Sequence, residues 1–582
     1  MKPTFEVVSA RINAAMGWAK PDTVIRNVQV PSVITGETEV TDIAILGNTI
    51  VSVYEPYDDA MLEGVKIIDG TGKFALPGFI NAHAHIESSV LTPYEYERVA
   101  LPFGETTLMA DPHEAANVLG NKAFEFFLKS ASGMVMDMYV QLSSCVPATN
   151  LETSGANLTA ADLAQFIDHP KAGGLAEMMN LGGVLGSDPE VIEKLLLFWN
   201  HAKPIDGHMP GIRGRALSAL AVANIRNDHE STTEAEGREK LKKGVQVLIR
   251  EGTVCKNLHA LFNLINTQNA PNLCFCTDDM KPHDIIAQKG TMAHMIRTSI
   301  AEGRDPMAVY RIATLSAATH FGLTDRGVIA PGRKADIVLL NNLETCDVAT
   351  VIKNGVVVTP EIFKARPALD AVGYQSVNVK AMTAADFAIE ESGPDMDVIG
   401  VIPGSIVTAP LTRATAGDDV IKLAVIERHG RAGGRMGLGL VSGFGIANGA
   451  IASTVAHDHH NVMVAGATDA DMAVAVNRLK DMGGGFVVVR NGKVLADLAL
   501  PVAGLMSDKP YETVVRDLDI LAEGLKQVCP LESAFMYLSF LGLCVIPTLK
   551  LTDKGLTLFE PEKGDTGPRL IRDPRGLKLN LA

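Results

Sequence analysis

The stretch Ile80-Asn81-Ala82-His83-Ala84-His85-Ile86-Glu87-Ser88-Ser89 decides the fold of this chain. Its first part is typical of a buried strand, on which residues i and i+2 project to the same side. His83 and His85 therefore point the same way, roughly 6–7 Å apart along the strand. Histidine is the commonest side-chain ligand of zinc and similar ions, so the pair suits one metal ion. We interpret it as the start of a metal site at a strand end.

Beyond this strand, apolar runs alternate with helical stretches at the spacing of strand–helix units. The helical stretches include Pro189–Trp199 and Glu234–Leu248. The strands are expected to end near His83, Asp111, Cys145, Glu177, His208, His229, Arg250 and Asp278. The number and pacing of these ends predict an α/β fold built on a (β/α)8 TIM barrel.

Two further parts are expected around the barrel, which we place at residues 77–320. Strand-like runs separated by turn residues fill residues 21–76, and a strand followed by a hairpin around Asn354-Gly355 lies within residues 321–368. We expect these two segments, one on each side of the barrel in the sequence, to build one small β-sandwich domain. Residues 369–582 alternate strands with helices and predict a C-terminal α/β domain.

Four polar side chains follow apolar strands later in the barrel. Glu177, His208, His229 and Asp278 stand at the expected ends of the fourth, fifth, sixth and eighth strands. Each alone would more often be a cap, an ion-pair partner or a structural histidine. A barrel, however, brings its carboxyl strand ends to one rim, where such enzymes keep their active sites. With the His-x-His pair, the set predicts a metal centre of nitrogen and oxygen ligands.

This ordered ligand set resembles that of the amidohydrolase superfamily, and further motifs resemble its bacterial adenine deaminase family. Glu177 stands where many binuclear members of the superfamily have a carboxylated lysine. In the barrel the resemblance rests on Pro77-Gly78-Phe79-Ile80, Glu87-Ser88-Ser89, Thr106-Thr107, Asp111-Pro112-His113-Glu114, Glu177-Met178-Met179-Asn180, Asp206-Gly207-His208, Asp228-His229-Glu230 and Thr277-Asp278-Asp279. It continues with Glu427-Arg428-His429-Gly430, Ala456-His457-Asp458 and Met482-Gly483-Gly484-Gly485, and covers the chain from about Val24 to Asp553.

The resemblance implies hydrolytic deamination of adenine to hypoxanthine and ammonia, in purine salvage or adenine catabolism. It implies two divalent cations and favours Mn²⁺, although the ligand types also fit Fe²⁺ or Zn²⁺. The first cation would be held by His83, His85 and Asp278, the second by His208 and His229, and Glu177 would bridge them. A hydroxide generated there would attack carbon 6, with Asp278 passing its proton to the leaving ammonia. Glu177 is a candidate for protonating ring nitrogen 1.

Purine recognition needs donors and acceptors at the ring edge, and Ser88, Asp111 and Glu114 near the first two strand ends are candidates. The segment His457–Asn461 is a second His/Asp cluster that fits a separate metal site, a lid over the barrel mouth or a solvated loop. Two residues depart from the family pattern, namely Asn81 where we expect Asp and His459 where we expect Ser. Either departure could shift substrate preference.

The composition limits the partners and the compartment. The chain has 582 residues and a formal net charge of -15, which does not attract nucleic acid or anionic membranes. We therefore expect a small-molecule purine substrate and a homo-oligomer, most simply a dimer. Seven cysteines without framework spacing, and the lack of an apolar leader within residues 1–20, favour a cytoplasmic protein. The longest apolar run, Ala534–Ile546, is too short to span a membrane and is expected in the core.

Other functions are distinguished by particular residues. A cytidine-deaminase-type zinc site would need a Pro-Cys-x-x-Cys to accompany His85-Ile86-Glu87, and the chain has none. Cys274 and Cys276 have the wrong spacing and are expected to be buried hydrophobes. A cyclic amidase of the dihydroorotase or hydantoinase kind shares the barrel and stays the alternative enzyme, and a non-catalytic barrel scaffold is the alternative from another class. Adenosine also stays open as a substrate.

Overall fold

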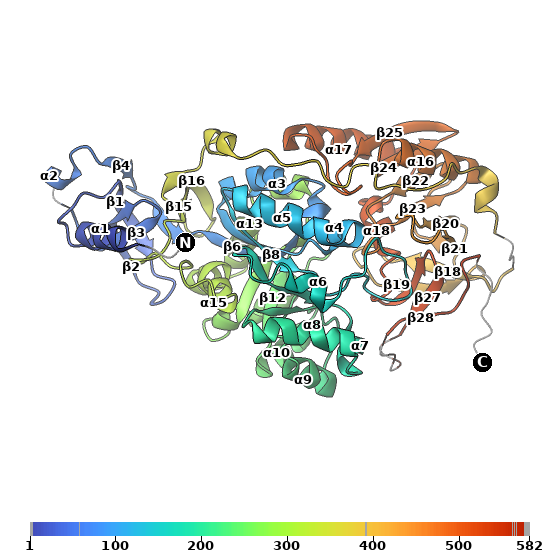
Figure 1. Ribbon diagram of the computed structural model, residues 1–582, viewed down its shortest axis with the longest axis horizontal. Helices are drawn as coiled ribbons and strands as arrows, with labels where there is room; N and C mark the ends of the chain where they lie inside the picture. The colour runs from blue at the N-terminus through green and yellow to red at the C-terminus, as the bar shows by residue number, and fades with distance from the viewer. Residues whose placement is uncertain are drawn as a thin grey trace.

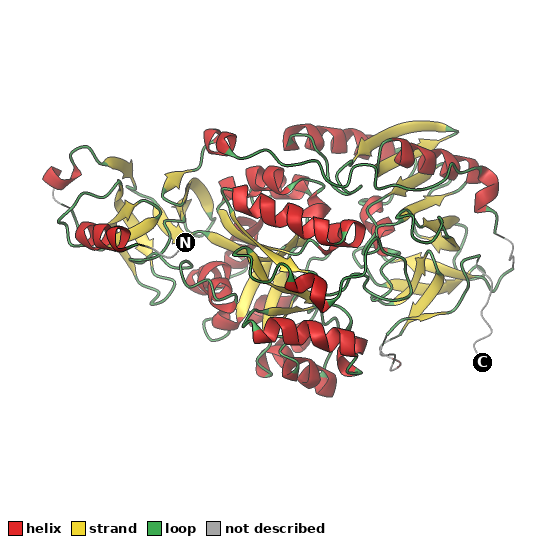
Figure 2. Ribbon diagram, viewed as in Figure 1, coloured by secondary structure: helices red, strands yellow, loops and turns green. Residues whose placement is uncertain are grey.

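The computed structural model describes residues 4–57, 59–389, 393–560, 563, 565 and 567–575. Figure 1 shows three parts in a row: a small β part at one end, a barrel in the middle and the C-terminal part at the other end. In Figure 2 the strands of the middle part are flanked by helices, the arrangement expected of a barrel built from strand–helix units.

Parallel strands line the barrel. They are β6 (Phe79–His85), β7 (Glu105–Ala110), β8 (Asp137–Leu142), β9 (Ala172–Met178), β10 (Ile205–Gly207), β11 (Asn227–Asp228), β12 (Gln246–Arg250), β13 (Leu273–Cys276) and its extension β14 (Asp278–Asp279). They pair in the orders β10-β9-β8-β7-β6-β14 and β11-β12-β13. The backbone bond from Arg226 N to Ile205 O, 3.3 Å long, joins the two runs beside β10 and β11. The predicted (β/α)8 barrel is confirmed.

Helices follow the barrel strands. They are α3 (Pro93–Ala100), α4 (His113–Leu119), α5 (Asn121–Gly133), α6 (Ala160–Ala164), α7 (Leu181–Leu185), α8 (Pro189–Asn200), α9 (Gly214–Val222), α10 (Glu234–Lys242), α11 (Leu258–Leu261), α12 (Pro282–Ala287), α13 (Thr291–Ala301), α14 (Pro306–Arg311) and α15 (Ala317–His320). The helix predicted at Glu234–Leu248 was wrong at its C-terminal end. It stops at Lys242, Gly244 turns the chain with φ +74°, and Leu248 belongs to the buried strand β12.

One glycine allows the first barrel strand to meet the second. A Cβ at Gly78 would lie 2.1 Å from Thr106 Oγ1, which is closer than any packed contact. Gly78 precedes β6 directly, so a side chain there would displace the strand that carries His83 and His85. The lack of a side chain at Gly78 is therefore one reason why β6, which carries the two histidines, can lie against β7.

The small β part combines strands from both sides of the barrel in the sequence. Its strands are β1 (Thr23–Pro31), β2 (Thr38–Leu46), β3 (Thr49–Val53), β4 (Lys66–Asp69), β5 (Phe74–Pro77), β15 (Ile337–Asn342), β16 (Asp347–Lys353) and β17 (Val356–Val357), accompanied by α1 (Phe5–Ala15) and α2 (Asp59–Leu62). The strands pair in the order β17-β16-β15-β5-β1-β2-β3. This sheet curls, because Thr49 at the start of β3 forms a bridge to Lys334, just before β15. Apolar side chains from both segments fill the space enclosed.

A buried carboxylate connects the small β part to the barrel. Asp137, at the start of β8, has one oxygen 2.7 Å from Lys353 Nζ and 2.6 Å from Lys334 Nζ. The same carboxylate contacts Arg326 at 2.9 Å and Lys171 at 2.8 Å. Burial opposes the charge of Asp137, yet these cations, Lys353 foremost, hold its pKa well below the usual range. The amino ends of the barrel strands therefore face the small β part, and their carboxyl ends face away from it.

The C-terminal part contains a second large sheet. Its strands β18 (Asp397–Val401), β19 (Thr408–Thr412), β20 (Val420–Ile426), β21 (Met436–Ser442), β22 (Ala450–Ser453), β23 (Val462–Gly466), β24 (Gly485–Arg490) and β25 (Lys493–Ala499) pair in the order β19-β18-β21-β20-β23-β22-β24-β25. The remaining elements are α16 (Asp469–Asp481), α17 (Tyr511–Lys526), α18 (Ala534–Phe540) and a small sheet of β26 (Thr548–Thr552), β27 (Gly555–Phe559) and β28 (Arg569–Leu570). The apolar run that begins at Ala534 is buried, as predicted. Within the described ranges, no helix has both the length and the apolar character needed to cross a bilayer.

Candidate metal centre

The two histidines of β6 direct ring nitrogens at the same point. His83 and His85 are buried, and their Nε2 atoms lie 3.1 Å apart. His85 Nδ1 is 2.9 Å from the carbonyl oxygen of Asp111, which can only accept, so this nitrogen carries the proton. The Nε2 lone pair of His85 is therefore free to bind a ligand in the space that it shares with His83.

Glu177, near the end of β9, contacts histidines of both neighbouring strand groups. Its Oε2 lies 2.8 Å from His208 Nδ1 and 3.0 Å from His229 Nε2. Its Oε1 lies 3.5 Å from His85 Nε2. Burial works against ionisation, but His208 and His229 outweigh it and hold the pKa of Glu177 well below its usual range. The carboxylate is thus ionised and stands between the two histidine groups.

Asp278 completes the first group at the eighth strand. One of its oxygens is 3.1 Å from His85 Nε2 and 3.5 Å from His83 Nε2. The other is 2.7 Å from Arg250 Nη1, and Arg250 also pairs with Glu230. Asp278 has φ +57°, a left-handed conformation that aspartate tolerates better than most residues and that turns the chain at the strand end. Against the effect of burial, Arg250 keeps the pKa of Asp278 well below its usual range.

These residues fit divalent cations. Ligand atoms of His83, His229 and Asp278 all lie within 4.8 Å of one another, as do those of Glu177, His208 and His229. Two nitrogens bound to one tetrahedral ion at about 2.0–2.1 Å would be roughly 3.3 Å apart, close to the spacing of the β6 histidines. The donors are imidazole and carboxylate, the usual ligands of Zn, Mn and Fe. The six side chains named from the sequence are therefore brought together, with His229 near both groups.

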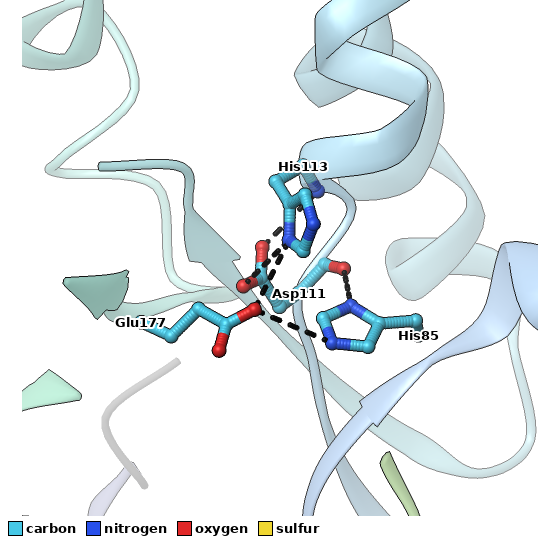
Figure 3. A group of neighbouring side chains, drawn as sticks. All are labelled: His85, Asp111, His113 and Glu177. Atoms are coloured by element: carbon cyan, nitrogen blue, oxygen red, sulfur yellow. Dashed lines mark hydrogen bonds and ion pairs between the residues drawn. The ribbon is translucent and has the colours of Figure 1, made fainter. Parts of the chain in front are cut away.

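His113 is a further polar residue of this centre. It belongs to the motif Asp111-Pro112-His113-Glu114, but no role was predicted for it. Figure 3 shows it with His85, Asp111 and Glu177. His113 Nδ1 lies 3.1 Å from Asp111 Oδ2 and 3.6 Å from Glu177 Oε1. Its position at the start of α4, directly after β7, was the sequence signal that could have identified it. Its other nitrogen, Nε2, lies 3.5 Å from Asp458 Oδ1, which comes from the C-terminal part.

Of the three proposed substrate-binding residues, Asp111 belongs with His85, His113 and Glu177 to one cluster that could hold an ion, Glu114 belongs with His457 and His460 to another, and Ser88 belongs to neither. Asp111 stands behind His85 and His113, which it contacts through its carbonyl and carboxylate oxygens. Ser88 Oγ donates to Glu114 Oε1 at 3.1 Å and also to Asp279, and Glu114 faces His457 Nδ1 at 3.3 Å. Ser88 lines a neighbouring apolar cavity, whereas none of the three lines the cavity that holds the histidines.

The segment His457–Asn461 borders the cavity of the metal centre, and Glu114, His457 and His460 form a cluster that could hold an ion, so the lid and the separate metal site both stay open. All its side chains are buried, so the solvated-loop interpretation was wrong. His457 and Asp458 line the same cavity as Glu177 and His229, together with Ile406, Phe540 and Leu543 of the C-terminal part. Asn81 and His459, the two departures, lie outside this lining: Asn81 Nδ2 donates to Thr277 Oγ1 at 2.9 Å, and His459 Nδ1 accepts from Asn461 N at 3.0 Å. Cys274 and Cys276 are buried in β13, as predicted.

Known proteins resemble nearly the whole chain. The Amidohydrolase family matches residues 74–358, and the Adenine deaminase C-terminal domain matches residues 406–562. An adenine deaminase of Gluconobacter oxydans is 50% identical, and the alignment covers 95% of this chain and 98% of that protein. The chain belongs to the adenine deaminase family. Adenine deaminases of Methylobacterium nodulans, 50% identical over 94% of this chain and 98% of theirs, and of Cereibacter sphaeroides, 48% identical over the same shares, are further relatives.

Solved structures resemble the chain more distantly. A β-aspartyl dipeptidase from Fervidobacterium islandicum AW-1 has a TM-score of 0.45 at 15% identity, with 60% of this chain and 98% of that chain covered. A triazine hydrolase variant has a TM-score of 0.43 at 16% identity, covering 60% of this chain and 96% of its own.

Proposed function

We propose that this chain hydrolyses adenine to hypoxanthine and ammonia. The observation that carries the proposal is the convergence of the His-x-His pair, Glu177, two further histidines and Asp278 in a member of the adenine deaminase family. We assign His83, His85 and Asp278 to one cation, His208 and His229 to a second, and Glu177 to both. When bound, the cations would lower the pKa of water so that a nucleophile is available near neutral pH.

The residues of the chain supply the proton transfers and the dry environment. Asp278 lies at the strand end with its Oδ1 facing the histidines, where it can take a proton from the attacking water. Returning that proton to the exocyclic nitrogen releases ammonia and leaves the oxygen on carbon 6. Phe540 and Leu543 cover the cavity from the C-terminal side and exclude bulk solvent. Ring nitrogen 1 needs the second proton of that water; Glu177, which is ionised, remains our candidate for first taking this proton and then delivering it.

We further propose Mn²⁺ as the working metal, with Fe²⁺ next, a cytoplasmic location and a homodimer. All seven cysteines are free, in accord with a reducing compartment. Metal analysis, cell fractionation and light scattering would test these points separately.

The test of the activity is ammonia release by protein loaded with Mn²⁺. Adenine, adenosine, dihydroorotate and hydantoin would be offered in parallel, with hypoxanthine identified by chromatography. We expect turnover of adenine. Hydrolysis of dihydroorotate or hydantoin without turnover of adenine would instead assign the chain to the cyclic amidases.

A further inference from the structure

Asp458 has an oxygen atom that no described residue satisfies. Its side chain is 2% exposed, and its Oδ1 lies 3.5 Å from His113 Nε2 and 3.8 Å from His457 Nδ1. Its Oδ2 is buried and has no hydrogen-bond partner among the described residues. Leaving a buried carboxylate oxygen unpaired is costly, and most such groups in folded proteins are paired. An unpaired oxygen beside a cavity therefore indicates that a ligand provides the missing donor.

The cavity beside Asp458 is polar on one side and apolar on the other. The barrel contributes the histidines and carboxylates of the metal centre, while Ile406, Phe540 and Leu543 form an apolar wall from the C-terminal part. Sites for small molecules combine apolar walls with placed polar groups that fix the orientation of the ligand, and this lining suits a planar heterocycle with polar edges. A carboxylate without a proton can only accept a hydrogen bond, so Asp458 selects for a ring N–H.

The position of Asp458 fits the edge of a purine that lies away from the reacting carbon. The ring of His113 lies between Asp458 and Glu177, with gaps of 3.5 Å and 3.6 Å on its two sides. The His113 ring therefore separates Asp458 from the metal ligand Glu177. Carbon 6 and nitrogen 9 are likewise on different rings of adenine, so a base that presents carbon 6 to the metals can direct nitrogen 9 toward the C-terminal part.

We propose that Asp458 accepts a hydrogen bond from the N9–H of adenine and thereby selects the free base over the nucleoside. In a nucleoside this nitrogen carries the ribose and has no hydrogen to donate. The C-terminal part would then set substrate specificity for a reaction that the barrel performs. The inference rests on the proposed deamination of adenine and deepens it.

The test compares substrates with and without the N9–H in the native holoenzyme and in Asp458→Asn. We expect kcat/KM for adenine to fall about 10- to 100-fold in the variant, mainly through KM, because a hydrogen bond to a charged group is weakened. The rate with 9-methyladenine, which has no such hydrogen, should stay unchanged. The ratio of the two kcat/KM values should therefore shrink by the same factor, as in a double-mutant cycle.

A binding measurement on the native protein and on one control variant supports the kinetics. In the native protein, hypoxanthine should inhibit at least 10-fold more tightly than 9-methylhypoxanthine. Asp553→Asn is the matched control, since Asp553 is a buried carboxylate of the same part whose oxygens are satisfied by Thr153 and Arg435. This control should keep the native preference for the compound with the free N9–H.

Two outcomes would overturn the inference. Equal inhibition by the two products in the native protein would remove the role of the N9–H. An equal loss of kcat for adenine and 9-methyladenine in Asp458→Asn would mean that Asp458 only orients His113. A native protein that releases no ammonia from adenine would instead refute the proposed function itself, so the two failures are distinguishable.

Discussion

Replacing Glu177 with glutamine tests the bridging role most sharply, because the shape is kept and the charge is lost. Glu177 Oε2 makes two close contacts to imidazole nitrogens, 2.8 Å to His208 and 3.0 Å to His229. With the cations bound, this carboxylate would face them instead of the imidazoles, and removing one partner of a buried charge pair costs about 3–5 kcal/mol. Metal affinity should then fall by about 10²- to 10⁴-fold, and adenine turnover should fall at least as much.

The assay is metal content by mass spectrometry after dialysis, combined with ammonia release at saturating adenine. Glu97→Gln is the control, because Glu97 is equally buried but bonds to Val135 N, Met136 N and Arg366, away from the centre. The control should retain both metals. Full metal occupancy with near-native turnover in Glu177→Gln would refute the bridging assignment.

Three further predictions follow from other carboxylates. Asp278→Asn should abolish ammonia release while the fold, checked by circular dichroism, is kept; near-native turnover would contradict the role given to Asp278. Asp137→Asn should lower the free energy of unfolding by about 3–5 kcal/mol, measured in urea, because Lys353 and the other buried cations lose their partner; an unchanged midpoint would contradict this. Burial, aided by the charge of Asp458, raises the pKa of Glu152 to about 8. The resulting stability is present below the unfolded pKa and is lost as pH rises through about 8, so Glu152→Gln should become more stable than the native protein by up to a few kcal/mol between pH 5 and 8. A stability difference that does not vary with pH would exclude this.

The ligands of the metal centre could be predicted because a barrel gathers the carboxyl ends of its strands, and the ligands lie at those ends. His83, Glu177 and Asp278 each follow an apolar run, and parallel strands bring such ends to one rim. Because side chains alternate along a strand, His83 and His85 were predicted to lie on one side of it. The distance of 3.1 Å between their Nε2 atoms confirms this prediction. Local rules were enough here, since each prediction needed only the position of a residue relative to its own strand.

Contacts between distant segments could not be predicted in the same way. His113 begins a helix rather than ending a strand, and Asp458 reaches the barrel from a loop between β22 and β23. Their contact depends on how the C-terminal part packs on the barrel, which no local pattern reveals. The helix predicted to reach Leu248 failed for a related reason, because β12 is buried on both faces and its short apolar run, Val247–Ile249, does not show whether its period is that of a helix or of a strand.

The central claim is that six side chains from distant parts of the chain share two cations. Anomalous diffraction from crystals soaked in Mn²⁺ tests it most directly. We predict two peaks, one beside His83, His85 and Asp278 and one beside His208 and His229, with Glu177 contacting both. A single peak, or manganese bound elsewhere, such as between Glu114, His457 and His460, would contradict it.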